Sequence, residues 1–307
     1  GRGLFISVAV GEQPPMTTAQ VWQFFLSGLT TGGTYALIAL GFSLVYNATG
    51  VINFAQGEFV MLGGMITAVG MSAWNLPLWL AALLAIAITT LVGLLLDRAA
   101  IRPARDASVV VLIIITVGAS IFLKGLASIV WGPDERPLPA FSGEAPISIF
   151  GATITPQSLW VLGATLVTAV AMWAIFEYTI VGKAMRACAI NPHAAQLCGI
   201  ELSRMTSWSF GLAAAIGAIA GIVLAPITMA QYNVGTMLGL KGFCAAILGG
   251  LGNGLGGILG GLILGVLEAL GAGLISSQYK DAIAFIVLIA VLLIRPSGIL
   301  GQEGGEQ

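Results

Sequence analysis

Apolar residues fill most of this chain in long runs, and polar residues gather in the short segments between the runs. A helix that spans a membrane needs about 20 predominantly apolar residues in a row. Runs of this kind occur at residues 21–46, 57–74, 78–96, 109–131, 159–176, 207–230, 242–275 and 282–294. The pattern predicts an all-α fold, a polytopic transmembrane helical bundle of about eight membrane elements in one domain.

Basic residues indicate which helix ends face the cytoplasm, because Lys and Arg are enriched in short cytoplasmic loops. Two loops separated by two spans carry basic clusters: Arg98, Arg102 and Arg105 in the first, Lys183, Arg186 and Arg204 in the second. The loop between them, residues 132–156, holds three acidic residues and only Arg136 as a basic one. We therefore expect this intervening loop on the periplasmic side.

The expected positions of the two chain ends decide whether the number of membrane-spanning helices is odd or even. Arg295 follows the last span and places the C-terminus inside, whereas counting back from the first basic loop places the start of the first span outside. Ends on opposite sides require an odd number of spans, so eight simple spans do not fit. Residues 242–275 are too many for one straight helix and too few for two. We expect a broken or re-entrant glycine-rich segment near residues 249–257, because irregular backbone is tolerated where it faces protein or water.

Composition excludes several other classes of protein. Hydrophobic residues make up 58% and charged residues 8% of the chain, against about 25% charged in soluble domains. The 42 glycines suit close packing of membrane helices, and the alternating polar positions of a β-barrel are missing. With a net charge of -1 and no basic tract, we expect no nucleic-acid partner.

The chain lacks the motifs of a metal site, a nucleotide site or a catalytic centre. Cys188, Cys198 and Cys244 have no CxxC spacing, and His193 is the single histidine. No GxxxxGK[ST] motif is present, so we do not expect this chain to bind ATP. Nothing arranges a nucleophile, a base and an orienting acid, so we expect a non-catalytic membrane protein with no metal or cofactor of its own.

The loop at residues 181–206 contains the signals of a short helix. Asn191 suits an N-cap, Pro192 suits the first helical position, and Gly199 supplies a left-handed residue after the end. The expected surface is small and mildly polar: His193, Ala194, Ala195 and Gln196. So short a helix needs a surface to dock on, which favours contact with a cytoplasmic partner; the alternative is an ordinary loop helix on lipid headgroups.

A polar group interrupts the apolar hairpin between the first two spans. Within residues 50–64 it comprises Asn53, Gln56 and Glu58, with Phe54 among them. An ionisable residue at membrane depth indicates function, and broken helices with polar residues form transporter sites. We take Asn53, Phe54, Gln56 and Glu58 as a candidate translocation path. The alternative is that Glu58 caps the next helix at the cytoplasmic interface.

Glycines recur at helical spacing in residues 248–261, LGGLGNGLGGILGG. Three of them satisfy GxGxxG, but no βαβ context surrounds them, which argues against a dinucleotide site. The small-xxx-small spacing predicts tight helix packing or subunit contact at Gly250, Gly252, Gly254, Gly257 and Gly261. Among the remaining charges, we expect Lys280 and Asp281 at an interface and Glu268 deeper, toward the bundle interior.

Several segments together resemble one family. Residues 27–64 resemble the N-terminal region of the H-type permease of bacterial branched-chain amino acid ABC importers. The segment GKAMRACAINPHAAQLCGI, residues 182–200, resembles that family's ATPase-docking loop, and the similarity continues more loosely to RPSGILG at residues 295–301. The family often has His where Gln56 stands, and this departure weakens any proposal of proton chemistry there.

The resemblance implies a multi-pass subunit of the bacterial inner membrane with several partners. These would be a homologous second permease, two cytoplasmic ATPase subunits that hold ATP and Mg, and a periplasmic substrate-binding protein. It implies a coupling helix at residues 191–199, flanked by Lys183 and Arg186. Residues 1–15 are interpreted as an extension or expression remnant before Met16, residues 16–301 as one permease domain, and residues 302–307 as a tail.

The function expected from the residues and the resemblance is ATP-driven import of branched-chain or other hydrophobic or neutral amino acids. One alternative is a permease for urea or short amides in the same superfamily. A sugar-importer permease shares the coupling-loop pattern, but the element INFAQGE at residues 52–58 argues against it. A further alternative is a stand-alone secondary transporter or channel, in which the docking loop would have no partner.

Overall fold

The computed structural model describes residues 17–105, 107–143, 145–149, 151–274, 276–295 and 297–301. The expected extension at residues 1–15, the expected start at Met16 and the expected tail at residues 302–307 lie outside the described residues. Statements about the structure therefore concern this described part of the chain.

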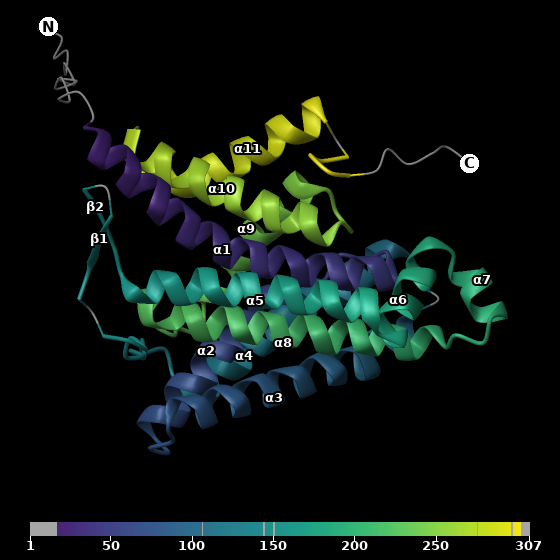
Figure 1. The fold of residues 1–307 in the computed structure, drawn as a ribbon. Helices are drawn as coiled ribbons and strands as arrows, with labels where there is room; N and C mark the ends of the chain where they lie inside the picture. Colours follow the sequence, from purple (N-terminus) through teal and green to yellow (C-terminus); the bar gives the residue numbers. More distant parts are fainter. Residues whose placement is uncertain are drawn as a thin grey trace, which may run out of the picture.

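Long apolar helices dominate the described residues and confirm the predicted all-α membrane bundle (Figure 1). The helices are α1 Thr18–Thr49, α2 Gln56–Ser72, α3 Leu78–Leu96, α4 Val109–Trp131, α5 Pro156–Tyr178, α6 Ile180–Ile190, α7 Pro192–Leu197, α8 Leu202–Thr228, α9 Val234–Gly249, α10 Gly254–Leu274 and α11 Lys280–Ile294. Short helical turns lie at η1 Asp97–Ile101, η2 Arg102–Ala104 and η3 Ser277–Tyr279. Within the described ranges, 7 helices are long and apolar enough to cross a membrane by length and composition.

Figure 1 shows α1 beginning at one end of the bundle, beside the only described strands, the hairpin of β1 Ile147–Ile149 and β2 Ala152–Ile154. The side chain of Gln23, near the start of α1, hydrogen-bonds to Thr153 in β2. Helices α6 and α7 lie at the opposite end. The expected periplasmic loop and the expected cytoplasmic loops are thus at opposite ends of the molecule.

The two basic loops meet directly, as their predicted placement on one side requires. Arg102, the first residue of η2, donates from Nη2 to the backbone oxygen of Ser203 at 2.9 Å and to Ser207 Oγ at 2.5 Å, both in α8. The same guanidinium pairs with the fully buried Asp97 at 3.3 Å. This contact fixes the start of α8 against the end of α3.

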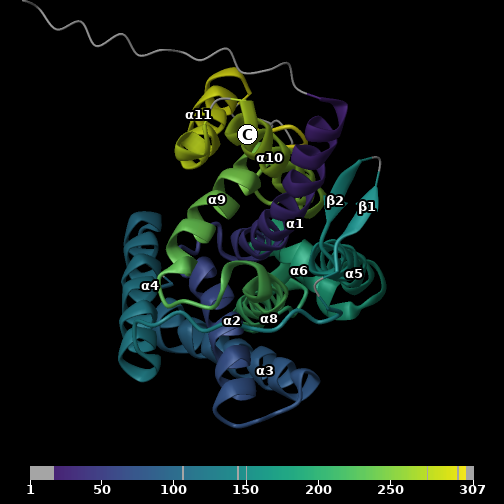
Figure 2. The same ribbon diagram turned by 90° about the vertical axis from the view of Figure 1, so that its left-hand side faces the viewer.

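Burial divides the helices into central and peripheral ones. In their most apolar windows, α1 is 89% buried and α8 is 72% buried, whereas α4 is 17% buried. Figure 2, along the bundle, shows α3, α4 and α11 at outer positions around α1, α2 and α8. The peripheral helices present apolar side chains outward, which suits a lipid environment.

The glycine-rich segment differs from the prediction in its extent. The expected break near residues 249–257 is present as a turn, residues 250–253, in which Gly250 (φ +102°) and Gly252 (φ +90°) adopt positive-φ backbone. The segment is not one broken element, however, because α9 begins at Val234 and α10 packs antiparallel against it. The described residues hold 7 helices that are long and apolar enough to cross a membrane and one shorter apolar helix, α9, in agreement with the expected bundle of about eight membrane elements.

Candidate functional site

The loop at residues 181–206 folds into two short helices where the sequence predicted one. The predicted helix is α7: Asn191 Oδ1 accepts a hydrogen bond from the backbone N–H of Ala194 at 3.0 Å, Pro192 is its first residue, and Gly199 has φ +83°. Helix α6 precedes it and was not predicted. Its N-cap Thr179 accepts from the N–H of Gly182 at 3.0 Å. Figure 1 shows α7 projecting beyond the long helices.

The exposed surface of this loop differs from the expected one. Ala195 was expected on the surface, but it is 4% exposed because the inner face of α7 packs on α6 and α8. His193 and Ala194 are exposed, as expected. Sequence reasoning missed the flanking aliphatic side chains, Ile190 at 86% exposure and Leu197 at 90%. Two large apolar side chains held in solvent beside a projecting helix are typical of a surface that binds another molecule.

The two expected basic residues of this loop differ in their contacts. Arg186 donates to the backbone oxygen of Phe176 and forms an ion pair with Glu177 at 3.3 Å. It therefore ties α6 back to the end of α5. Lys183 is exposed on α6. Of the two, Lys183 is the better placed for contact with a partner.

Helix α2 begins deep inside the bundle. The side chain of Gln56, its first residue, lies against Gly41 of α1, where an added Cβ would be 2.1 Å from Gln56 Nε2. Gly41 lies eight residues before the end of α1 at Thr49, a distance of roughly 12 Å at 1.5 Å per residue. The first residue of α2 therefore lies about two helical turns in from the end of α1. The interpretation of Glu58 as a cap at the cytoplasmic interface stays a prediction.

Glu58 lies in the first turn of α2 and is fully buried. Its Oε1 accepts hydrogen bonds from Ser120 of α4 at 2.9 Å and from Thr236 of α9 at 3.3 Å. Lys124 lies nearby, with Nζ 3.5 Å from the Thr236 hydroxyl. The second oxygen, Oε2, has no hydrogen-bond partner among the described residues. The carboxylate thus sits where α2, α4 and α9 meet, with one oxygen unused.

The other hairpin residues face a different set of helices. Gln56 Nε2 donates to the backbone oxygen of Ala213 in α8 at 3.0 Å, and its Oε1 has no partner in the described structure. Asn53 Oδ1 accepts from the N–H of Ala55 at 3.1 Å, and its Nδ2 is likewise unpartnered there. The ring of Phe54 lies 5.5 Å from that of Phe243 in α9.

These side chains do not form one cluster, although they are close in sequence. Gln56 points to α1 and α8, whereas Glu58 points to α4 and α9. Residues two apart on a helix lie on nearly opposite faces. The structure therefore brings Glu58 together with Ser120 and Thr236, two residues that the sequence did not connect with it.

Glycines allow α2 to approach its neighbouring helices closely. A Cβ on Gly57 would lie 2.0 Å from the backbone oxygen of Gly235, and one on Gly221 of α8 would lie 1.9 Å from that of Val60. Such distances leave room only for hydrogen. Helix α2 therefore touches both α9 and α8 through its backbone.

Only some of the glycines that were predicted to pack helices lie in a helix. Gly261 packs on α1, where a Cβ would lie 2.3 Å from the N of Ala36, and Gly257 lies against Ala39 on the same face. Gly254 begins α10 and faces Leu40 of α1. Gly250 and Gly252, which were expected on a packing helix, instead form the turn, because its backbone needs the positive φ that glycine favours.

A second buried polar cluster lies where α1, α9, α10 and α11 meet. Glu268 of α10 is fully buried, as its expected depth requires. Its carboxylate pairs with Lys241 at 2.9 Å and Lys280 at 3.4 Å, and it accepts a hydrogen bond from the Tyr35 hydroxyl at 2.9 Å. Lys241 also pairs with Asp281 at 2.6 Å. Sequence reasoning missed this arrangement because its members are far apart in the chain.

No group of three or more His, Cys, Asp or Glu side chains in the described ranges is placed to hold a metal ion. The polar atoms at Glu58 and at Glu268 are few and lie among apolar helices.

Comparisons with known proteins point to one family. Residues 24–292 match the family model described as the branched-chain amino acid transport system permease component. The chain is 37% identical over 298 residues to the high-affinity branched-chain amino acid transport system permease protein LivH of Salmonella typhimurium, covering 93% of this chain and 97% of LivH. It is 36% identical over 304 residues to BraD of Pseudomonas aeruginosa, a permease protein of the same description, with the same coverage.

More distant similarities extend to a sugar permease and to one solved structure. The chain is 30% identical over 273 residues to the ribose import permease protein RbsC of Haemophilus influenzae, covering 84% of this chain and 80% of RbsC. The solved structure is PsaBC from Streptococcus pneumoniae in complex with Fab, with a TM-score of 0.51 and 10% identity. It covers 89% of this chain and 92% of the matched one, and it supports the fold alone.

Proposed function

The chain belongs to the family of permease components of branched-chain amino acid transport systems, and we propose how this permease carries its substrate and responds to ATP. It is a multi-pass inner-membrane subunit of an ABC importer for amino acids. The proposal is that branched-chain or other neutral amino acids pass beside α2 and α9, and that α7 transmits the state of separate ATPase subunits.

The start of α2 against α9 is the observation that supports the path. The start of α2 is buried and the start of α9 lies against it. Both N-termini carry partial positive charge suited to a substrate carboxylate. Glu58 Oε2, which lacks a partner among the described residues, would accept the substrate's ammonium group. A zwitterionic amino acid would thus meet both signs of charge at one depth, with apolar helices around its side chain.

Helix α7 is proposed as the contact with the ATPases. ATP binding can shift the permease only if its two states contact the ATPases differently. The exposed Ile190 and Leu197 beside α7 offer apolar area that a partner would cover. Two ATPase subunits would hold ATP and Mg, a second permease would complete the transmembrane unit, and a periplasmic protein would deliver substrate.

The test of this proposal is ATP-dependent uptake in proteoliposomes that contain the permease pair, the ATPases and the binding protein. The variant is Leu197→Asp, and the matched control is Leu197→Met, which keeps the apolar surface. We expect Leu197→Asp to lose ATPase binding and uptake together, and Leu197→Met to retain both. Normal uptake by Leu197→Asp would contradict a docking role for α7. A substitution at Ala195 is unsuitable for this test, because its side chain is buried and a larger one would disturb the packing of α7.

The same vesicles test the substrate class. Labelled leucine, alanine, urea and ribose are offered in turn; ribose is included because the chain also resembles a ribose import permease. We expect uptake of leucine that needs ATP and is absent for ribose. Uptake of ribose or urea alone would overturn the amino acid assignment, and uptake that ignores ATP would favour a stand-alone transporter.

A further inference from the structure

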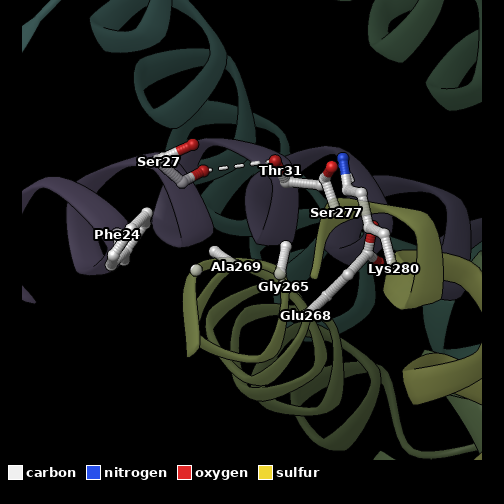
Figure 3. A pocket seen from close by; sticks show the side chains of 10 residues that line it. Phe24, Ser27, Thr31, Gly265, Glu268, Ala269, Ser277 and Lys280 are labelled. Atoms are coloured by element: carbon white, nitrogen blue, oxygen red, sulfur yellow. Dashed lines mark hydrogen bonds and ion pairs between the residues drawn. The ribbon is translucent and has the colours of Figure 1, made fainter. Parts of the chain in front are cut away.

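A cavity of about 260 Å³ opens between α1, α10 and the start of α11 (Figure 3). Polar groups line one part of it: Ser27, Thr31, Ser277, Glu268 and Lys280. Phe24 and small residues at the end of α10 line the rest. Its volume is just below the roughly 300 Å³ at which small-molecule pockets begin, and it lies toward the end of the bundle that carries the β-hairpin.

Glu268 and Lys280 line this cavity and belong to a cluster whose charges balance in pairs. Lys241 and Lys280 supply two positive charges, and Glu268 and Asp281 supply two negative ones. Lys241 is held on both sides, by Glu268 at 2.9 Å and by Asp281 at 2.6 Å. Such a cluster carries both signs of charge but no net charge, so it does not favour a net anion or a net cation.

Lys280 is the member of the cluster that can most easily change partner. Its ion pair with Glu268 Oε1 is the longest in the cluster, 3.4 Å, and its side chain is 46% exposed. Glu268, in contrast, is fully buried and keeps Lys241 and Tyr35 as close partners when Lys280 moves. The ammonium of Lys280 can therefore turn to a ligand without leaving Glu268 unpaired.

From this arrangement we propose that the cavity is a binding site for the zwitterionic head of a neutral amino acid, at the periplasmic side of the permease. Lys280 binds the carboxylate, aided by the hydroxyls of Ser27 and Ser277. Glu268 Oε1 exchanges Lys280 for the ammonium group of the ligand and keeps its ion pair with Lys241. The apolar side chain of the ligand lies against Phe24 and the small residues of α10.

The fit of the apolar wall depends on glycine. A Cβ on Gly273 would lie 2.4 Å from the ring of Phe24, so a larger residue there would push the ring toward the cavity. Gly265, at the other end of the wall, lies directly on α1, with a Cβ position 2.3 Å from the N of Gly32. Small residues thus keep α10 close to α1 while they leave the space beside Phe24 open.

This inference rests on the proposed function, because an amino acid importer supplies the ligand. The site is separate from Glu58, which contacts α4 and α9 and not this cavity. The amino acid would bind first in this cavity. It would then move to the place beside Glu58 where the starts of α2 and α9 meet. An anionic lipid headgroup is a poorer fit, because the charged cluster has no net positive charge for it.

The first arm of the test measures transport in the complete importer. Lys280→Gln removes the charge, and Lys280→Arg is the matched control that keeps it. We expect Lys280→Gln to raise the half-saturating concentration of binding-protein-delivered leucine by about tenfold or more, the usual scale of a lost charge-assisted contact. Lys280→Arg should stay within about threefold of wild type, because the positive charge remains. Equal values for wild type and Lys280→Gln would overturn the site.

The second arm detects binding without transport. Ala272→Cys is introduced with Cys198→Ser, and alkylation of the introduced thiol is followed in nanodiscs without ATP. We expect protection by leucine, and none by isoamylamine or 4-methylpentanoate, which each carry one of its charged groups. Protection that depends on anionic lipid and not on leucine would overturn the proposal. If wild type does not transport but leucine still protects the introduced thiol of the Ala272→Cys variant, the proposed function fails while the site stands.

Discussion

The carboxylate of Glu58 accepts a hydrogen bond from the hydroxyl of Thr236 at 3.3 Å, which joins the first turns of α2 and α9. The same oxygen accepts from Ser120 at 2.9 Å and so includes α4 in the contact. A rearrangement of any of these helices must stretch or replace one of these bonds. Glu58 is therefore placed to link substrate binding in the bundle to the relative positions of α2 and α9.

Replacing Glu58 by Gln removes the negative charge of the side chain and keeps its size. The amide oxygen of Gln still accepts from Ser120 and Thr236, so we expect little change in thermal stability. The variant loses the negative charge for the substrate's ammonium group, and we expect leucine uptake to fall by about tenfold or more. Uptake and melting temperature are measured on the same preparation. Unchanged uptake would mean that the carboxylate only packs the helices.

Replacing glycine by alanine is expected to change stability differently at a helix contact and at an open position. At Gly221 an added Cβ would lie 1.9 Å from the backbone oxygen of Val60, so Gly221→Ala should destabilise the permease by about 1–3 kcal/mol. Gly118 of α4 has nothing within 4 Å of that position. Gly118→Ala should be neutral or stabilising by up to about 1 kcal/mol, because alanine favours helix.

Thermal unfolding of both variants in the same detergent checks this difference. The two substitutions add the same methyl group to a membrane helix, so a general cost of alanine would lower both melting temperatures. A loss confined to Gly221→Ala supports backbone contact between α2 and α8. Equal stability of the two variants would contradict the close approach of these helices.

Sequence predicted the peripheral helices best. The expected spans at residues 78–96 and 109–131 coincide with α3 and α4, because these helices are apolar on all sides and lie at the periphery. Pro77 and Ser108 mark their starts with extended backbone. In such helices, length and hydropathy determine the element and tertiary contacts add little.

The inner helices were harder to predict because their polar residues have distant partners. The expected span 242–275 omitted the first half of α9, where Lys241 and glycines reduce the apolar signal. Lys241 is tolerated there because Glu268 of α10 and Asp281 of α11 neutralise its charge. Local capping signals at Asn191 did predict α7, but which of its faces is buried depends on α6 and α8.

The contact between the two basic loops predicts a coupled pair of substitutions. Arg102 bonds to Asp97, Ser203 and Ser207 through its planar guanidinium, which Lys cannot reproduce. We expect Arg102→Lys and Ser207→Ala each to destabilise the permease by about 1–2 kcal/mol. The double variant should lose less than the sum, because both remove one network. Strict additivity in thermal unfolding would show that the two residues act separately.

The two cysteines in the loop at residues 181–206 are expected to differ in reactivity in a pH-dependent way. Cys198 is exposed at the end of α7, whereas Cys188 is 3% exposed on α6 and burial raises the pKa of its thiol above the ordinary 9.0. The thiolate is the reactive form. Near neutral pH we therefore expect maleimide to label Cys198 alone, and Cys198→Ser to abolish labelling of the folded permease.

The sign of the pH effect follows from the same burial. Because its pKa is raised by folding, Cys188 keeps its proton in the folded state at a pH where the unfolded state has lost it. The contribution of the buried thiol to folding stability is therefore complete below the unfolded-state pKa and declines as pH rises above it. Labelling of Cys188 should therefore need a higher pH than labelling of an exposed thiol does. Mass spectrometry of labelled peptides across pH measures this. Equal labelling of Cys188 and Cys198 near neutral pH would mean that α6 does not hold Cys188 against the bundle.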